Sequence, residues 1–339
     1  MRVISCTGYY GTGSSAVTNL FAEFDNICCL GENEYRFLHE PDGIADLEYN
    51  IVENNNRHNT SNAIKNYIKY VRTMKKNCYG IYDVFEDEFD KATDEFIDNI
   101  TELKTRTWWT KDRLDRGPLF SFIDRVYSFT KRLFKGELKT EIRYSLLTDR
   151  EPAYYSAIDE ETFLSAVRRY INRLLSFVNK NKLPYVMVDQ MVPPTNTKRF
   201  LRYFDDVKII VTDRDPRDLY LLERFEWKWG VIPVKDVKDY VEWFKITRKF
   251  SRPSDEDKSR VMRVYFEDMI YDYDNTTRRL IEFVGLDVSE HVRPKTVFDP
   301  SRSVKNTNLM SKYPQAAKEI EYITAELKDY LYDFEAHSN

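Results

Sequence analysis

The sequence predicts an α/β fold in which helices flank a parallel sheet, with a large helical insertion after the second strand. Residues 185–189 and 207–212 are nearly continuous apolar runs, which is typical of parallel strands covered on both faces. Near the amino terminus, an apolar strand, a glycine-rich loop and a helix follow one another within residues 3–24. The 339-residue chain contains only 10 Gly and 12 Pro, fewer than average, so we expect long elements joined by few turns. We expect a single domain over residues 1–339.

The composition excludes several classes of protein. Hydrophobic residues make up 42% of the chain, which is too many for a disordered protein. The formal net charge of −4 argues against general binding of nucleic acid. The four cysteines form no CxxC pair, so we expect neither a disulfide framework nor a zinc site; they are Cys6, Cys28, Cys29 and Cys78. The first residues carry no signal peptide, and no apolar run reaches the ~20 residues that span a bilayer. We therefore expect a cytoplasmic protein without a transmembrane segment.

The first strand, residues 3–8, leads into the glycine-rich loop of residues 8–15 and then into a helix whose apolar residues recur up to Phe24. This order of elements holds phosphate groups in P-loop folds, because backbone N–H groups and the positive end of the helix dipole face the anion. The loop has the spacing of a nucleoside-triphosphate site, but Ser14 replaces the lysine that such sites use. The loop therefore argues against ATP or GTP hydrolysis. The hydroxyls of Ser14 and Ser15 favour a smaller anion, and a glycine-rich turn with a serine cap is the purely structural alternative.

The second strand is expected over residues 27–30, and the insertion over residues 45–180. Two parts of the insertion repeat apolar residues at helical spacing and predict amphipathic helices. The first set is Ile64, Ile68, Val71 and Met74, and the second is Phe163, Val167, Ile171, Leu174 and Val178. Residues 104–143 carry eleven Lys or Arg and five Asp or Glu, together with Trp108 and Trp109. The insertion is therefore the part of the chain in which we expect a ligand to be selected.

Arg214 lies just past the apolar run of residues 207–212, and so at the carboxyl edge of the sheet, where ligands of α/β proteins bind. Pro216 can open the helix that follows. A guanidinium held there offers a rigid fork of donors for a phosphate. A surface arginine paired with a neighbouring aspartate fits the same segment equally well.

The last third of the chain completes the predicted sheet. A strand is expected over residues 261–266, a helix over residues 275–284 and a loop over residues 299–313. A final helix is expected to end near Leu331.

The glycine-rich loop and the arginine segment together resemble the sulfotransferase family that uses 3′-phosphoadenosine 5′-phosphosulfate (PAPS) and releases 3′,5′-ADP (PAP). The segments Phe266-Glu-Asp268 and Leu280 to Leu286 are similar to further stretches of that family. The resemblance implies that PAPS is the donor and that it is bound by Gly11, Thr12, Gly13, Ser14, Ser15, Arg214, Lys305 and Asn306. It implies no metal, because PAPS has no bridge between β- and γ-phosphates.

Two positions depart from the family pattern. The family's basic residue in the first loop falls on Gly11, and its serine eight residues after the arginine falls on Leu222. If the chain is active, Arg36 or Lys305 is expected to supply the missing charge.

The segment Gly31-Glu-Asn-Glu34 resembles heparan sulfate 3-O-sulfotransferases, in which the second glutamate is the general base. The resemblance assigns that role to Glu34. Two solvated loop acids, Glu32 and Glu34, are the alternative, because most glutamates are solvated.

The expected acceptor is a carbohydrate, possibly anionic, because flat apolar rings beside cations suit a sugar that carries acid groups. Arg36, Trp108 and Trp109 are the expected acceptor-binding residues. Core tryptophans beside a solvated basic helix fit the same stretch. By analogy, the resemblance implies a bacterial enzyme acting on a surface polysaccharide or its precursor.

Two other functions remain open from the sequence. A P-loop kinase could use Asp189, at the end of the run of residues 185–189, to hold magnesium, although Ser14 speaks against it. A non-catalytic protein with a degenerate anion site would explain Gly11 and Leu222.

Overall fold

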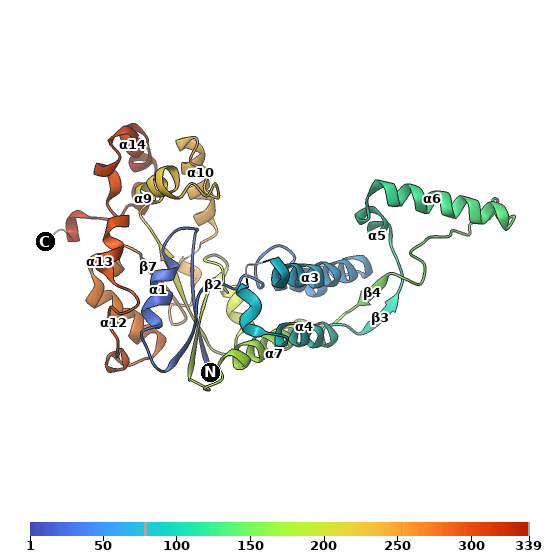
Figure 1. Cartoon of the computed structure of the whole chain (residues 1–339), viewed down its shortest axis with the longest axis horizontal. Coiled ribbons are helices and arrows are strands. Elements are labelled where there is room, and N and C mark those ends of the chain that lie inside the picture. The colour runs from blue at the N-terminus through green and yellow to red at the C-terminus, as the bar shows by residue number, and fades with distance from the viewer. Residues whose placement is uncertain (78–79, 252, 338–339) are drawn as a thin grey trace. The chain divides into compact units, whose positions relative to one another are not determined.

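A five-stranded parallel sheet lies between helices in the computed structural model and confirms the predicted fold class (Figure 1). The structure describes residues 1–77, 80–251 and 253–337, so Cys78 lies outside the described residues. The strand order is β2-β5-β1-β6-β7. The strands are β1 (Arg2–Gly8), β2 (Ile27–Glu34), β5 (Tyr185–Asp189), β6 (Val207–Asp213) and β7 (Val261–Tyr265).

The central strands are buried on both faces, as their apolar runs predict. Helix α1 (Ser14–Phe21) and helix α12 (Tyr273–Val284) share one apolar cluster with β1, in which Leu20 and Leu280 are fully buried. A second cluster joins α9 (Pro216–Leu221), α10 (Val237–Lys249) and α14 (Ala317–Glu326). The short helices α8 (Thr197–Phe200), α11 (Asp268–Tyr271) and α13 (Pro300–Ser303) lie in the connections.

Parallel strands end at the same edge of a sheet, and this edge gathers the residues of interest. Gly8 ends β1, Glu34 ends β2, Asp189 ends β5 and Asp213 ends β6. The sheet pairing sets Glu34 opposite Asp189. The fold therefore brings together four segments that are far apart in the sequence.

Contacts divide the chain into two compact units. Unit 1 consists of Met1–His39, Cys78–Glu86 and Ile171–Asn339 and contains the sheet. Unit 2 consists of Glu40–Asn77 and Asp87–Tyr170 and overlaps with most of the insertion predicted over residues 45–180. The elements of the insertion are α2 (Ile44–Glu48), α3 (Arg57–Asn77), α4 (Glu88–Asn99), β3 (Leu103–Arg106), α5 (Thr110–Asp115), α6 (Gly117–Phe134), β4 (Pro152–Tyr155) and α7 (Glu160–Val178), the last of which continues into unit 1.

Several details differ from the expected elements. The loop expected over residues 299–313 contains the short helix α13 and two helical turns, Val304–Asn306 and Leu309–Lys312. Strands β3 and β4 pair antiparallel in a region expected to be mostly helical, and β3 is fully exposed, so it lacks the apolar alternation that marks a strand. Helix α14 ends at Glu326 and is followed by a separate turn, Lys328–Tyr330, before Leu331. Among the described residues, no helix has both the length and the apolar character needed to cross a membrane.

Candidate functional site

The glycine-rich loop between β1 and α1 is held in a left-handed backbone conformation. Gly11 has φ 63° and Gly13 has φ 89°, and Gly13 is the residue that precedes the first turn of α1. The buried Thr12 hydroxyl accepts a hydrogen bond from the Tyr9 N–H at 3.0 Å and donates to the Thr212 carbonyl at 2.8 Å. Thr12 therefore fixes the shape of the loop, while Ser14 and Ser15 form the first turn of the helix.

Packing explains why a basic residue is missing from this loop. A Cβ atom added at Gly11 would lie 2.5 Å from the Trp227 ring, and one added at Gly13 would clash with the Phe266 ring. Both positions also have a positive φ, which favours glycine. A basic side chain at Gly11 would therefore need Trp227 to move.

The Ser14 hydroxyl is oriented by Gln190, the residue that follows β5. The Gln190 side chain donates through Nε2 to Ser14 Oγ at 3.0 Å, and the Thr7 hydroxyl donates to Gln190 Oε1 at 3.0 Å. Gln190 has φ 55°, so the chain turns sharply just after Asp189. The amino end of α1 and the carboxyl end of β5 are therefore linked through these side chains.

Two carboxylates lie side by side at the ends of β2 and β5. Asp189 is only 2% exposed, and its Oδ1 has no hydrogen-bond partner among the described residues. Burial, and then the nearby charge of Glu34, raise the pKa of Asp189 to about 7. Glu34 is partly exposed and forms an ion pair with Arg36, whose guanidinium lies 5.9 Å from the Tyr10 ring of the glycine-rich loop. Arg36 thus connects the candidate base to that loop.

The neighbouring Glu32 has different surroundings. Glu32 is exposed and accepts a hydrogen bond from the Asn19 amide of α1 at 2.6 Å. Between Cys29 and Glu34 the pairing of β2 with β5 shifts, and Gly31 has φ 73°. Glu34 thus lies beside Asp189 and Glu32 beside α1, so substitutions at the two positions distinguish the roles of the two carboxylates.

Sequence reasoning missed two side chains at this edge and gave Asp189 only a kinase role. His39 donates through Nε2 to the Gln190 carbonyl at 2.9 Å, and burial lowers the pKa of His39 to about 4, so its ring is neutral. Asp189 could have been found, because it ends a predicted parallel strand at the edge where ligands bind. His39 and Gln190 carry no such signal, since their positions depend on turns.

Arg214 is buried and joins two loops. It donates to the Gly11 carbonyl at 3.1 Å and to the Asn306 carbonyl, and its guanidinium carbon lies 4.6 Å from the Phe266 ring and 5.7 Å from the Trp227 ring. Its Nε has no hydrogen-bond partner among the described residues. A surface arginine paired with an aspartate therefore does not describe Arg214.

The three aspartates close to Arg214 in the sequence form their main contacts with groups other than Arg214. Asp213 pairs with Arg248 at 2.6 Å, and Asp215 pairs with Arg217 at 2.6 Å. Asp218 accepts the backbone N–H groups of residues 308 and 309 at 2.7 and 2.8 Å. Asp218 thus fixes the loop that follows Asn306.

The remaining predicted nucleotide-binding residues lie in the same unit. Lys305 is exposed in the turn Val304–Asn306, and Asn306 contributes its carbonyl to Arg214. Leu222 is fully buried in the apolar cluster of α9, α10 and α14, so a polar side chain there would face the core.

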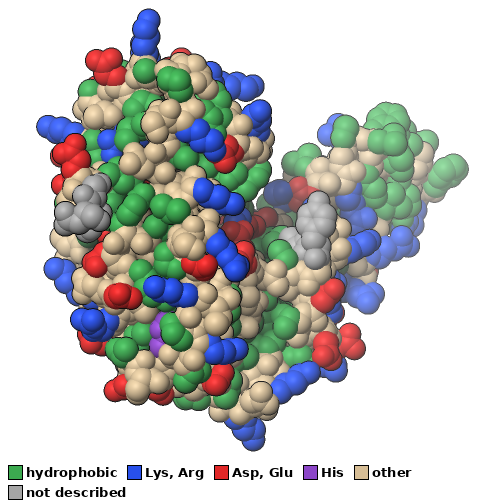
Figure 2. Space-filling model, turned by 60° about the vertical axis from the view of Figure 1, so that its left-hand side comes forward, with side chains coloured by type: hydrophobic (Ala, Val, Ile, Leu, Met, Phe, Trp, Pro, Cys, Tyr) green, Lys and Arg blue, Asp and Glu red, His purple; other side chains and the backbone are tan. Residues whose placement is uncertain are grey.

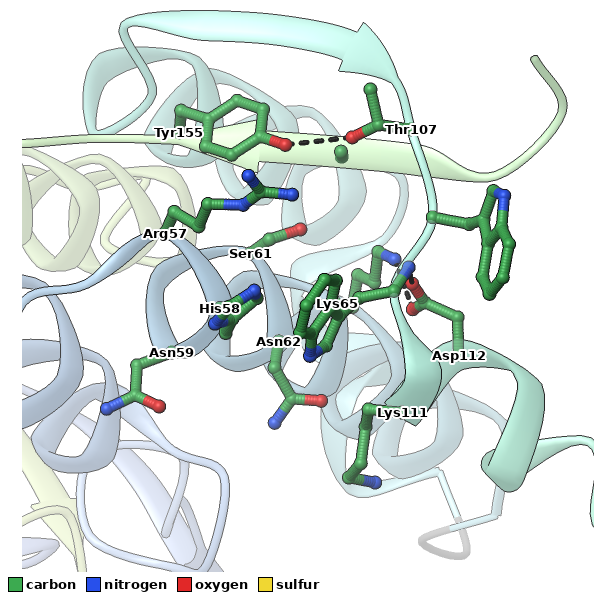
Figure 3. Close-up of a pocket in the computed structure, with 13 residues that line it drawn as sticks. Arg57, His58, Asn59, Ser61, Asn62, Lys65, Thr107, Lys111, Asp112 and Tyr155 are labelled. Carbon is green, nitrogen blue, oxygen red and sulfur yellow. Dashed lines mark hydrogen bonds and ion pairs between the residues drawn. The ribbon is translucent and has the colours of Figure 1, made fainter. Parts of the chain in front are cut away.

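Trp108 and Trp109 lie in unit 2, beside a pocket of about 240 Å³ (Figure 3). The Trp109 ring stacks on His58 with centroids 4.0 Å apart, and the Arg57 guanidinium lies 5.4 Å from the Trp109 ring. Lys65 also lines the pocket and pairs with Asp112 at 2.6 Å. The pocket therefore combines aromatic faces with cations. Within the ranges that the structure describes, no cluster of three or more His, Cys, Asp or Glu could hold a metal ion.

A model of the sulfotransferase family matches residues 4–290. Among solved structures, the chain is similar to a sulfotransferase from Mycobacterium tuberculosis H37Rv, at 10% identity over 91% of this chain and 76% of that one, with a TM-score of 0.36. It is also similar to retinol dehydratase in a complex with retinol and PAP, at 11% identity over 94% of this chain and 71% of that one, with a TM-score of 0.33. No curated protein matches.

Proposed function

Because the chain belongs to the sulfotransferase family, we propose that it transfers the sulfuryl group of PAPS to a hydroxyl of a carbohydrate. One observation carries the proposal: the glycine-rich loop, the start of α1 and the carboxylates of Glu34 and Asp189 share one edge of the sheet. An anion-binding loop beside a base is what a transfer to a hydroxyl needs. The closer resemblance to heparan sulfate 3-O-sulfotransferases stays a prediction.

The residues at this edge fit the donor. The backbone of the loop and the hydroxyls of Ser14 and Ser15 would hold the 5′-phosphosulfate at the positive end of α1. Arg214, whose buried Nε lacks a partner among the described residues, would bind the 3′-phosphate together with Lys305. Arg36 would supply the positive charge that Gly11 cannot, because it lies against the loop. When bound, PAPS supplies a sulfuryl group on a phosphate leaving group.

Glu34 is the proposed base. An acceptor hydroxyl must lose its proton as its oxygen attacks, and a carboxylate oxygen of Glu34 would take that proton. The ion pair with Arg36 holds the Glu34 carboxylate in place. Asp189 lies opposite Glu34 in the pairing of β2 with β5, and burial together with the charge of Glu34 favours the protonated form of Asp189.

The pocket beside Trp109 supports an acidic sugar as the acceptor. Sugar rings present flat apolar faces that pack on aromatic rings, and Arg57 would attract an acid group. Trp108 and Arg36 are further proposed acceptor-binding residues. A bacterial surface polysaccharide or its precursor carries such sugars, and this choice rests on analogy.

One assay tests the proposal: transfer of labelled sulfate from PAPS to a panel of neutral and acidic glycans. Glu34→Gln keeps the size of the side chain and removes its basicity, so we expect kcat to fall by ~10²–10⁴-fold with PAP affinity nearly unchanged. Glu32→Gln is the matched control and should cost much less.

Two results would contradict the assignment. Loss of activity in Glu32→Gln alone would move the base to Glu32. Magnesium-dependent binding of ATP in preference to PAP, measured by calorimetry, would favour the kinase alternative.

A further inference from the structure

Helix α6 in unit 2 is amphipathic, but its polar side is the one that packs on the protein. Ser121 and Asp124 are buried, and Ser128 lies one or two turns further along the same side. Ser121 donates to the Arg113 carbonyl at 3.3 Å, and Asp124 accepts from the Ser145 hydroxyl at 2.9 Å. Ser128 accepts from the Tyr144 N–H at 3.2 Å. Three short polar side chains therefore attach the helix to its own unit.

The opposite side of α6 is apolar and exposed. We call it the α6 apolar face, and it consists of Leu119, Phe122, Ile123, Val126, Phe129 and Leu133. Leu119 is 72% exposed, Phe122 is 65% exposed and Phe129 is 57% exposed. On the view in Figure 2, hydrophobic side chains gather over the end of unit 2 that carries α6, with Lys and Arg side chains beside them. A helix on the surface of a domain ordinarily turns such a face toward the core, whereas this face is exposed.

Positive charge predominates along α6. Residues 116–135 contain five Lys or Arg and one acid, Asp124, which is buried, whereas the whole chain has a net charge of −4. At helical spacing, the exposed Arg125 borders the α6 apolar face, and its long side chain can reach outward past the apolar residues. Lys131 and Arg132 lie toward the packed side, where Arg132 donates to the carbonyls of Leu138 and Thr140.

We propose that the α6 apolar face binds an anionic lipid surface, with Phe and Leu side chains inserted among the acyl chains and Arg125 on the headgroups. Phe and Leu on one face with Lys and Arg on the rest of the helix is the pattern of helices that lie in the plane of a membrane. A second copy of the chain fits less well, because a symmetric contact would bring the net positive charge of residues 116–135 against itself. The proposal goes beyond sulfuryl transfer and does not depend on it.

Flotation of the full-length protein with vesicles tests the proposal. Vesicles of phosphatidylcholine alone are compared with an equimolar mixture that contains phosphatidylglycerol. We expect binding to the anionic vesicles at about 0.1 M salt and much weaker binding at about 1 M salt or to the neutral vesicles, because screening weakens headgroup attraction. Arg125→Glu should weaken binding by at least ~fivefold, the value of one surface cation.

A matched pair of double variants tests the apolar part. Phe122→Ser with Phe129→Ser should lower vesicle affinity by at least ~100-fold, since each ring is worth ~10-fold or more when buried. Ile246→Ser with Phe250→Ser changes two side chains that are each 56% exposed in unit 1, and should leave vesicle binding unchanged. PAP binding by all variants checks that unit 1 is folded, and it also separates a failure of this proposal from a failure of the proposed function.

Three outcomes would overturn the proposal. Equal binding to neutral and anionic vesicles would exclude recognition of negative charge. A protein that ignores vesicles but forms a dimer that Phe122→Ser with Phe129→Ser abolishes would assign the face to a second copy. A monomer that ignores vesicles would mean that the face is covered within the chain.

Discussion

Replacing Asp189 by Asn should change how the stability of the protein depends on pH. Burial and the charge of Glu34 raise the pKa of Asp189 from the ordinary 3.8 to about 7. A raised pKa in the folded state means that the proton stabilises the fold, so this contribution is complete below the unfolded pKa and is lost as pH rises through the folded pKa. Asp189→Asn cannot ionise and should remove that loss.

The size of the effect follows from the two pKa values. One pKa unit corresponds to about 1.4 kcal/mol. Between about pH 5 and about pH 8, ionisation of Asp189 should lower the free energy of unfolding by ~2–3 kcal/mol. Because Asp189 is 2% exposed, solvent screening reduces this value little.

Urea unfolding over a series of pH values measures the effect. The unaltered protein should lose stability from about pH 5 to about pH 8 more steeply than Asp189→Asn does, and Asp239→Asn, at an exposed position on α10, should behave as the unaltered protein. Glu34→Gln removes the nearby charge and should reduce the slope in part. Identical slopes in the unaltered protein and in Asp189→Asn would refute the reasoning, since Asp189 would then titrate at its ordinary pKa.

Two further predictions concern the nucleotide site. Arg214→Lys keeps the charge but loses the planar fork of donors, so PAP should bind ~10- to 100-fold more weakly. Adenosine 5′-phosphosulfate lacks the 3′-phosphate and should bind as before. Calorimetry measures both affinities, and equal losses for the two nucleotides would mean that Arg214 does not bind the 3′-phosphate. Gly11→Lys restores the family's basic residue, but its side chain would meet the Trp227 ring, and the backbone there has a positive φ. We therefore expect weaker PAP binding and a free energy of unfolding that is lower by ~1–3 kcal/mol. Tighter PAP binding would show that the Trp227 ring moves aside.

The sequence predicted the parallel sheet because strands that are covered on both faces consist of continuous apolar residues. The apolar runs at residues 185–189 and 207–212 correspond to β5 and β6 in the structure. Strand β3 has no such apolar run, because its four residues are exposed. The pattern of apolar residues therefore predicted the strands of the core but not the pairing of β3 with β4.

The site was predictable only in part, because long-range packing decides much of it. Trp227 lies 216 positions from Gly11, so nothing in the loop itself indicates that a ring fills the space beside it. The same holds for Asp189, whose unusual pKa comes from burial and from Glu34 on another strand. In α6, periodicity alone predicts a face turned to the core, and only the packing of Ser121 and Asp124 reverses it.

The contacts of Arg214 join two loops before any ligand is bound. Two of its nitrogens already serve the carbonyls of Gly11 and Asn306, which belong to loops about 300 positions apart. A guanidinium has five N–H donors, so two carbonyls leave three donors, that of Nε among them, for a phosphate. A 3′-phosphate bound as proposed would therefore add to a network that already ties the glycine-rich loop to the loop of Asn306, and would hold both loops more firmly.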